Sequence, residues 1–93
     1  ISNIFKELHD FKMKVDVIQN SAISFSVCFF DKYNNIDALV KNLEGKFKIE
    51  MHKNVSLFTI RHFDEKSIKR ISHKRKLILE QRTEKMVRLI FSN

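Results

Sequence analysis

Three polar side chains lie close together in the sequence and could bind a small zwitterion. Asp16 offers a carboxylate, Asn20 an amide and Ser21 a hydroxyl. A carboxylate can pair with an ammonium group, and amides and hydroxyls can hydrogen-bond a ligand carboxylate. Gln19 adds a second amide to this polar corner, residues 19–21. We expect a ligand here if the flanking segments hold these groups at one edge of a sheet.

Two apolar runs flank the corner and predict the strands that would position it. Apolar residues alternate with Ser and Cys across residues 23–29, which is the period of a strand with one buried face. A shorter β-branched run, residues 15–18, precedes the corner. The segment therefore predicts two strands joined at residues 19–21.

Helical spacing of apolar residues predicts three helices. The first covers residues 4–11, the second residues 36–43, and a shorter third follows Asp64, whose side chain can cap it. Gly45 is the only glycine, and we expect it in the left-handed conformation that often ends a helix.

Further apolar runs predict strands at residues 47–51, 55–60, 77–81 and 86–91. The expected order is αββαβ followed by βαββ, so the second half repeats the first with shorter elements. The fold class is then α+β, with helices on one face of an antiparallel sheet in each half.

Length and composition limit the class of protein. The 93 residues suffice for a modest core, and no apolar run approaches the length of a membrane span. The chain shows no charged-then-apolar leader, so we expect a cytoplasmic location and no membrane partner. Cys28 is the only cysteine and is expected to be reduced. Because the chain begins at Ile1 rather than Met, we expect a fragment of a longer protein.

No catalytic constellation is visible, so we expect neither catalysis nor a cofactor or metal within these residues. The sequence has no glycine-rich phosphate loop, no GxSxG elbow, no HExxH and no cysteine pair. Its four histidines are scattered over different predicted elements, which is typical of surface histidines.

The net charge of +7 opens a different class of function. The excess is concentrated between Lys66 and Arg88, and such a patch can bind nucleic acid. No predicted strand, however, carries the glycine- and aromatic-rich motif of an RNA-binding sheet. A solvated surface, or contact with another domain of a longer polypeptide, accounts for the charge equally well.

Three segments resemble the regulatory region of aspartate kinases. IFKELHDFKMKVDVIQNSAISFSVCF, residues 4–29, resembles the segment that opens this region, with its VD pair, polar turn and Ser/Val-rich strand. KNVSLFTIRHF and KLILEQRTEKMVRLIF resemble the second regulatory module. The resemblance implies tandem ACT domains, each a ferredoxin-like βαββαβ unit. The first unit would span residues 1–53, without its first strand, and the second, shorter unit residues 54–93.

The resemblance also implies a function. Aspartate kinases phosphorylate L-aspartate with ATP in the biosynthesis of lysine, threonine and methionine. The kinase domain and its ATP site are absent from these residues, so the fragment would sense an end-product amino acid, lysine or threonine, and form a homodimer. By motif, the effector-binding residues would be Val15, Asp16, Asn20, Ser21 and Ala22. Asp16 would hold an ammonium group, and backbone amides near Val15 and Ser21 would bind the effector carboxylate.

The sequence leaves three alternatives open. The family usually has Glu directly after the Ser, and Ala22 stands there instead, which favours a purely structural dimerisation scaffold that binds no effector. The basic nucleic-acid module is another alternative. For Asp16 itself, the alternative to a ligand contact is a turn-supporting residue that hydrogen-bonds local amides.

Overall fold

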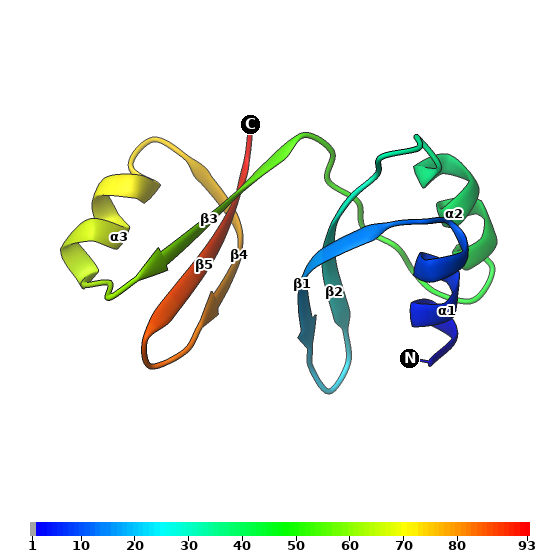
Figure 1. Ribbon diagram of the computed structural model, residues 1–93, viewed down its shortest axis with the longest axis horizontal. Helices are drawn as coiled ribbons and strands as arrows, with labels where there is room; N and C mark the ends of the chain where they lie inside the picture. Colours follow the sequence, from blue (N-terminus) through cyan, green and yellow to red (C-terminus); the bar gives the residue numbers. More distant parts are fainter. Residues whose placement is uncertain (1) are drawn as a thin grey trace. The chain divides into compact units, whose positions relative to one another are not determined.

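The computed structural model describes residues 2–93, with side chains from Ile4 onward (Figure 1). The chain divides into two compact units, Ile1–Glu50 and Met51–Asn93, whereas the sequence predicted a boundary after residue 53. The described residues form three helices and two small antiparallel sheets. The predicted α+β class is confirmed, and the arrangement is compatible with a ferredoxin-like fold.

The first unit is a two-stranded hairpin with both of its helices packed against one face. Its elements are α1 (Ser2–Asp10), β1 (Lys14–Asn20), β2 (Phe25–Phe30) and α2 (Ile36–Leu43). The core of this unit is made by Leu8 of α1, Met13, and Leu39 of α2, with β1 and β2 contributing Val15, Val27 and Phe29. The helical spacing predicted for α2 is confirmed at both of its ends.

A tight C-terminal turn fixes the direction of the chain between α1 and β1. The Met13 amide donates to the Leu8 carbonyl at 2.9 Å, and the Lys12 amide donates to the His9 carbonyl at 3.0 Å. Lys12 has φ of 59°, the left-handed position of this Schellman motif. The apolar contact that accompanies the motif is present, because Leu8 and Met13 share one core cluster. Strand β1 therefore starts directly under α1.

Hydrogen bonds from Asp31 and Asn35 tie α2 to the rest of the unit. The two carboxylate oxygens of Asp31 accept from the backbone amides of Asn35 and Ile36, each at 2.8 Å. These amides belong to the N-terminal end of α2, which has no intrahelical acceptor for them. The Asn35 side-chain Nδ2 donates to the Phe11 carbonyl at the end of α1, at 3.0 Å. One short segment thus satisfies both helix ends.

The second unit contains a split β-α-β motif. Its elements are β3 (Val55–Arg61), α3 (Glu65–Ser72), β4 (Lys76–Arg82) and β5 (Met86–Ser92). The strand order is β3-β5-β4, and β5 is antiparallel to both neighbours (Figure 1). Helix α3 connects the two outer strands, which are therefore parallel to each other. Val87, Leu89 and Phe91 of β5 pack with Ile68 of α3 in the core.

The predicted cap of α3 is confirmed. The Asp64 carboxylate accepts from the Ser67 amide at 2.7 Å, and the Ser67 hydroxyl completes a capping box with the Asp64 backbone. These hydrogen bonds lower the pKa of Asp64 below its usual value, and the bond from the Ser67 amide has the largest effect. The charged carboxylate also suits the positive end of the helix dipole.

Two local predictions are wrong. Residues 47–51 were expected to form a strand, but they are irregular, and Phe47, Ile49 and Met51 are exposed. Alternation alone does not make a strand, because a strand also needs an edge to pair with. Gly45 does not adopt a left-handed conformation, since the structure has no glycine with positive φ. The turn after α2 is instead closed by the Lys46 and Phe47 amides, which both donate to the Leu43 carbonyl at 2.9 Å.

The corner between β1 and β2 also lies later in the chain than predicted. Gln19 and Asn20 are still in β1, where they pair with Ser26 and Phe25. The connection consists of residues 21–24, so Ile23, expected to begin the second strand, lies in the turn and is 98 % exposed. The first partner on β2 is Phe25.

Replacing Asp31 tests the bond between the hairpin and α2. We expect Asp31→Ala to lower the free energy of unfolding of the first unit by about 1–2 kcal/mol, because two helix amides lose their acceptor. Asp31→Asn keeps one acceptor oxygen and should cost about half as much. Tyr33 is the only tyrosine and the chain has no tryptophan, so denaturation followed by tyrosine fluorescence reports on this unit. A loss below about 0.5 kcal/mol in Asp31→Ala, as at an ordinary surface position, would contradict the assigned role.

Candidate functional site

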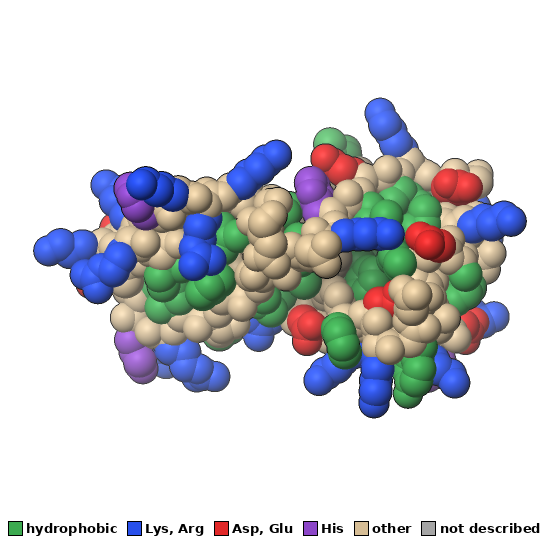
Figure 2. Space-filling view, turned by 90° about the horizontal axis from the view of Figure 1, so that it is seen from above, with side chains coloured by type: hydrophobic (Ala, Val, Ile, Leu, Met, Phe, Trp, Pro, Cys, Tyr) green, Lys and Arg blue, Asp and Glu red, His purple; other side chains and the backbone are tan. Residues whose placement is uncertain are grey.

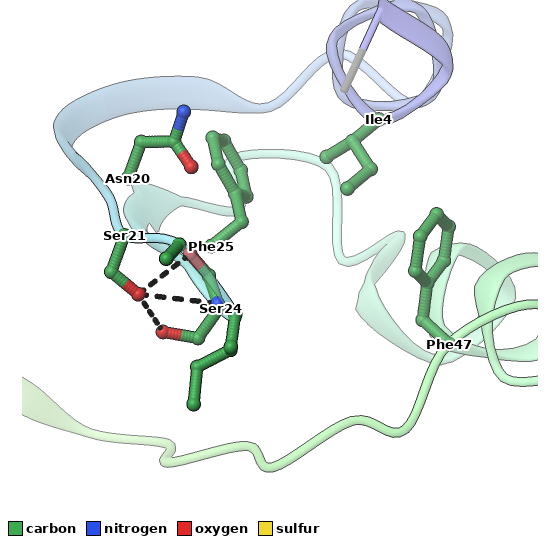
Figure 3. A pocket seen from close by; sticks show the side chains of 8 residues that line it. Ile4, Asn20, Ser21, Ser24, Phe25 and Phe47 are labelled. Atoms are coloured by element: carbon green, nitrogen blue, oxygen red, sulfur yellow. Dashed lines mark hydrogen bonds between the residues drawn. The ribbon is translucent and has the colours of Figure 1, made fainter.

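A shallow, open cleft of about 230 Å³ lies at the β1–β2 turn, within the first unit. It is bounded by the end of β1, the turn, the start of β2, the first turn of α1 and the segment after α2 (Figure 3). Its lining residues are Ile4, Asn20, Ser21, Ala22, Ile23, Ser24, Phe25 and Phe47. Backbone and hydroxyl groups lie on the turn side, and apolar side chains face them across the cleft.

Two serine side chains hold the turn together. The Ser21 Oγ lies 2.6 Å from the Ser24 Oγ and accepts from the Ser24 amide at 3.2 Å (Figure 3). The Ser21 amide donates to the Ser24 carbonyl at 2.9 Å. Hydroxyl bonds of this kind stabilise turns without glycine. The Ser21 amide, which the family resemblance offered as a carboxylate ligand, is therefore occupied inside the turn.

The next two backbone amides are available for a ligand. Ala22 and Ile23 lie at the exposed tip of the turn, and their N–H groups donate to no other described group of the chain. Adjacent backbone N–H groups that are not used in secondary structure can bind a carboxylate. Both residues line the cleft, so their N–H groups are candidates to bind a ligand carboxylate.

The opposite wall of the cleft is apolar. Ile4 of α1 and Phe47 lie across from the turn, and Phe25 forms the floor beside Asn20 (Figure 3). Asn20 and Phe25 are cross-strand partners, so their side chains share one face of the hairpin. Phe5 holds the Phe25 ring edge-to-face, with ring centroids 5.5 Å apart and planes at 85°.

The residues expected to bind an effector are divided between the two ends of β1. Asn20, Ser21 and Ala22 line the cleft. Val15 packs in the core with both helices, and Asp16 is the extra residue of a bulge between Val15 and Val17. Because a strand rises about 3.3 Å per residue, Asp16 lies roughly 13 Å along β1 from Asn20.

The apolar part of the cleft was not predicted from the sequence. Ile4 and Phe47 come from segments that only the fold brings to the hairpin, and residues 47–51 were predicted to form a strand rather than a wall of the cleft.

Asp16 affects the only cysteine of the chain, Cys28. Burial of the Cys28 thiol raises its pKa, and the negative charge of Asp16 raises it further. The thiol is therefore less ionised at neutral pH than an exposed cysteine.

The second unit contains the whole net charge of the chain. Residues 1–50 hold as many acidic as basic side chains, so the excess of +7 belongs to residues 51–93. Lys66, Lys69 and Arg70 of α3 share one helix face, opposite the buried Ile68, and the C-cap residue His73 follows them. We call these four residues together with 74–76 the basic face. In the view of Figure 2, few Asp or Glu side chains lie among the Lys and Arg side chains of the unit that contains α3.

Three of the four carboxylates of the second unit, Asp64, Glu65 and Glu80, have partners that the structure shows. Arg82 binds Glu65 at 2.6 Å and Glu80 at 3.3 Å, and the hydrogen bond to Glu65 raises the pKa of Arg82. Asp64 caps α3. The Arg75 guanidinium lies 4.7 Å from the Phe58 ring centroid, which holds it over the sheet. The ion pairs of Glu65 and Glu80 use Arg82, which is not part of the basic face.

Comparison with known proteins identifies no relative. No protein-family model matches the chain, and no curated protein and no solved structure is significantly similar to it. Within residues 2–93, no helix has the length and apolar character needed to cross a bilayer. The same residues bring together no group of three or more His, Cys, Asp or Glu side chains that could hold a metal ion.

Proposed function

We propose that this chain is a regulatory module that binds an amino acid, of the ACT type found in aspartate kinases, and that the effector binds in the cleft at the β1–β2 turn. The observation that carries the proposal is this cleft, which combines two available backbone N–H groups with an apolar wall. In the parent enzyme, phosphorylation of aspartate with ATP would take place outside these residues.

The fold and the sequence resemblance support the ACT assignment. The βαββ order of the second unit and the αββα order of the first are both parts of the βαββαβ order of an ACT domain. Three segments that resemble the family fall on these elements, including the β1–β2 hairpin. A strand before α1 and another after α2 would complete the first unit.

The cleft can bind the parts of an amino acid separately. The ligand carboxylate would accept hydrogen bonds from the Ala22 and Ile23 amides. The ammonium group would donate to the Asn20 side-chain oxygen, and the ligand side chain would lie against Ile4, Phe25 and Phe47. A ligand that favours one of two conformations of the parent would shift its activity, typically by about 1–3 kcal/mol of coupling.

The location of the proposed site can be tested with one variant of Asn20 and one variant of Asp16. With an amino acid at about a hundred times its dissociation constant, the module should gain roughly 2.7 kcal/mol, or several degrees in Tm. Asn20→Ala should reduce this gain, because Asn20 lines the cleft. Asp16→Ala should keep it, because Asp16 lies at the other end of β1.

Thermal unfolding of the purified chain is measured by tyrosine fluorescence with each of the common amino acids. If Asp16→Ala loses the ligand-dependent rise in Tm and Asn20→Ala keeps it, the effector binds at the start of β1 and not at the turn. If no amino acid changes Tm in the parent chain, the module is a dimerisation scaffold without an effector, and the proposed function is wrong.

The basic face favours a second candidate function, which is binding the phosphate backbone of a nucleic acid. Its cations Lys66, Lys69 and Arg70 share one helix face, and Lys74 and Lys76 follow shortly after the helix. Lys and Arg side chains in such an array neutralise phosphates and release counterions, which makes affinity fall steeply with salt. The apolar face of α3 is used in the core, so this helix has no apolar face left to insert into a lipid surface.

Charge removal on α3 tests this candidate. We expect the triple variant Lys66→Gln, Lys69→Gln, Arg70→Gln to weaken binding to mixed-sequence single-stranded RNA. The slope of log K against log salt should fall in magnitude by about 2, since each phosphate contact contributes roughly 0.7. A matched control, Lys6→Gln, Lys14→Gln, Lys41→Gln, removes the same charge from the first unit and should leave the slope unchanged. Fluorescence anisotropy measures both, and equal slopes in the two variants would contradict the candidate.

A further inference from the structure

The lining of the turn cleft contains no ionisable side chain. Its described members are aliphatic, aromatic, hydroxyl or amide residues. We propose that the cleft selects an α-amino acid with an uncharged, apolar side chain and discriminates against cationic amino acids such as lysine. This inference rests on the proposed function, because it names the ligand class of the same site.

The apolar wall is suited to an aliphatic ligand side chain. Phe47 is 40 % exposed, and Ile4 and Phe25 are half-buried, so a ligand side chain placed among them removes their apolar surface from water together with its own. Phe5 braces Phe25 edge-to-face, which fixes the floor of the cleft before a ligand arrives. A terminal methyl group gains by this contact, whereas a terminal ammonium group loses hydration there.

No carboxylate lines the cleft that could form an ion pair with an ammonium group on the ligand side chain. Asp16 lies at the opposite end of β1, in the bulge beside Val15. Glu7 is one helical turn after Ile4, but its side chain accepts from the Asn42 Nδ2 at 3.4 Å, on the side of α2. Both groups are absent from the lining. A lysine side chain would therefore have to leave the apolar wall or remain unpaired in it.

Norleucine and lysine isolate this effect, because norleucine has a terminal methyl group where lysine has its ε-aminomethylene end, on a side chain otherwise equally straight. We expect norleucine to bind with a dissociation constant at least about four-fold below that of lysine, which is the effect of one methylene-sized apolar contact. Isothermal calorimetry and the ligand-dependent rise in Tm give the two constants on the same chain.

A charge placed at Phe47 should reverse the preference. Phe47 lies on the apolar wall, is 40 % exposed and belongs to neither core cluster, so its replacement disturbs no core contact. We expect Phe47→Glu to strengthen lysine binding relative to norleucine, and to do so less at high salt. Phe47→Gln removes the same ring without adding a charge, and should not favour lysine.

The outcomes separate this inference from the proposed function. Tighter binding of norleucine, reversed by Phe47→Glu and not by Phe47→Gln, supports the inference. Equal or tighter binding of lysine by the unmodified chain overturns the inference and leaves the amino-acid module standing. A Phe47→Glu variant that binds amino acids but keeps its preference overturns the placement of the ligand side chain against Phe47. Absence of binding by every amino acid overturns both.

Discussion

A two-stranded hairpin is only marginally stable in water, and this constraint governs the first unit. The β1–β2 hairpin is stable because α1 and α2 cover one of its faces, and the helices stay there because their ends are joined. Asp31 satisfies the first amides of α2, while Asn35 satisfies a carbonyl at the end of α1. The left-handed turn at Lys12 then delivers β1 beneath α1. The cleft exists only because these joints set the first turn of α1 beside the end of the hairpin.

The turn itself combines rigidity with open hydrogen-bonding groups. The Ser21 and Ser24 side chains close the turn, so that the two amides between them are not needed for its stability. The apolar wall comes from three separate places in the chain, namely α1, β2 and the segment after α2. A ligand that touches both sides would therefore add a further connection between these elements. Such a ligand could change the stability of the unit as a whole, which is what a regulatory module requires.

Strongly periodic segments were predictable from the sequence, and segments that depend on distant partners were not. The spacing of Leu39 and its neighbours defined α2, and Asp64 identified the start of α3, because both signals are local. Residues 47–51 alternate like a strand, but the hairpin offers them no edge, so Phe47 serves as a wall of the cleft. The polar corner between the two strands was predicted about two residues too early. The bulge at Asp16 and the contribution of Ile4 could not be predicted, since both follow from strand register and helix packing.

The most direct test of the account is an amide-resolved NMR titration of the chain with norleucine. We expect the largest 15N and 1H shift changes at the Ala22 and Ile23 amides, with smaller changes at Asn20 and Phe47, because the ligand carboxylate accepts from those two N–H groups. The amides of Val15 and Asp16 should move little. Saturable changes centred on Val15 and Asp16, or no saturable change at Ala22 and Ile23, would contradict a ligand site at the β1–β2 turn.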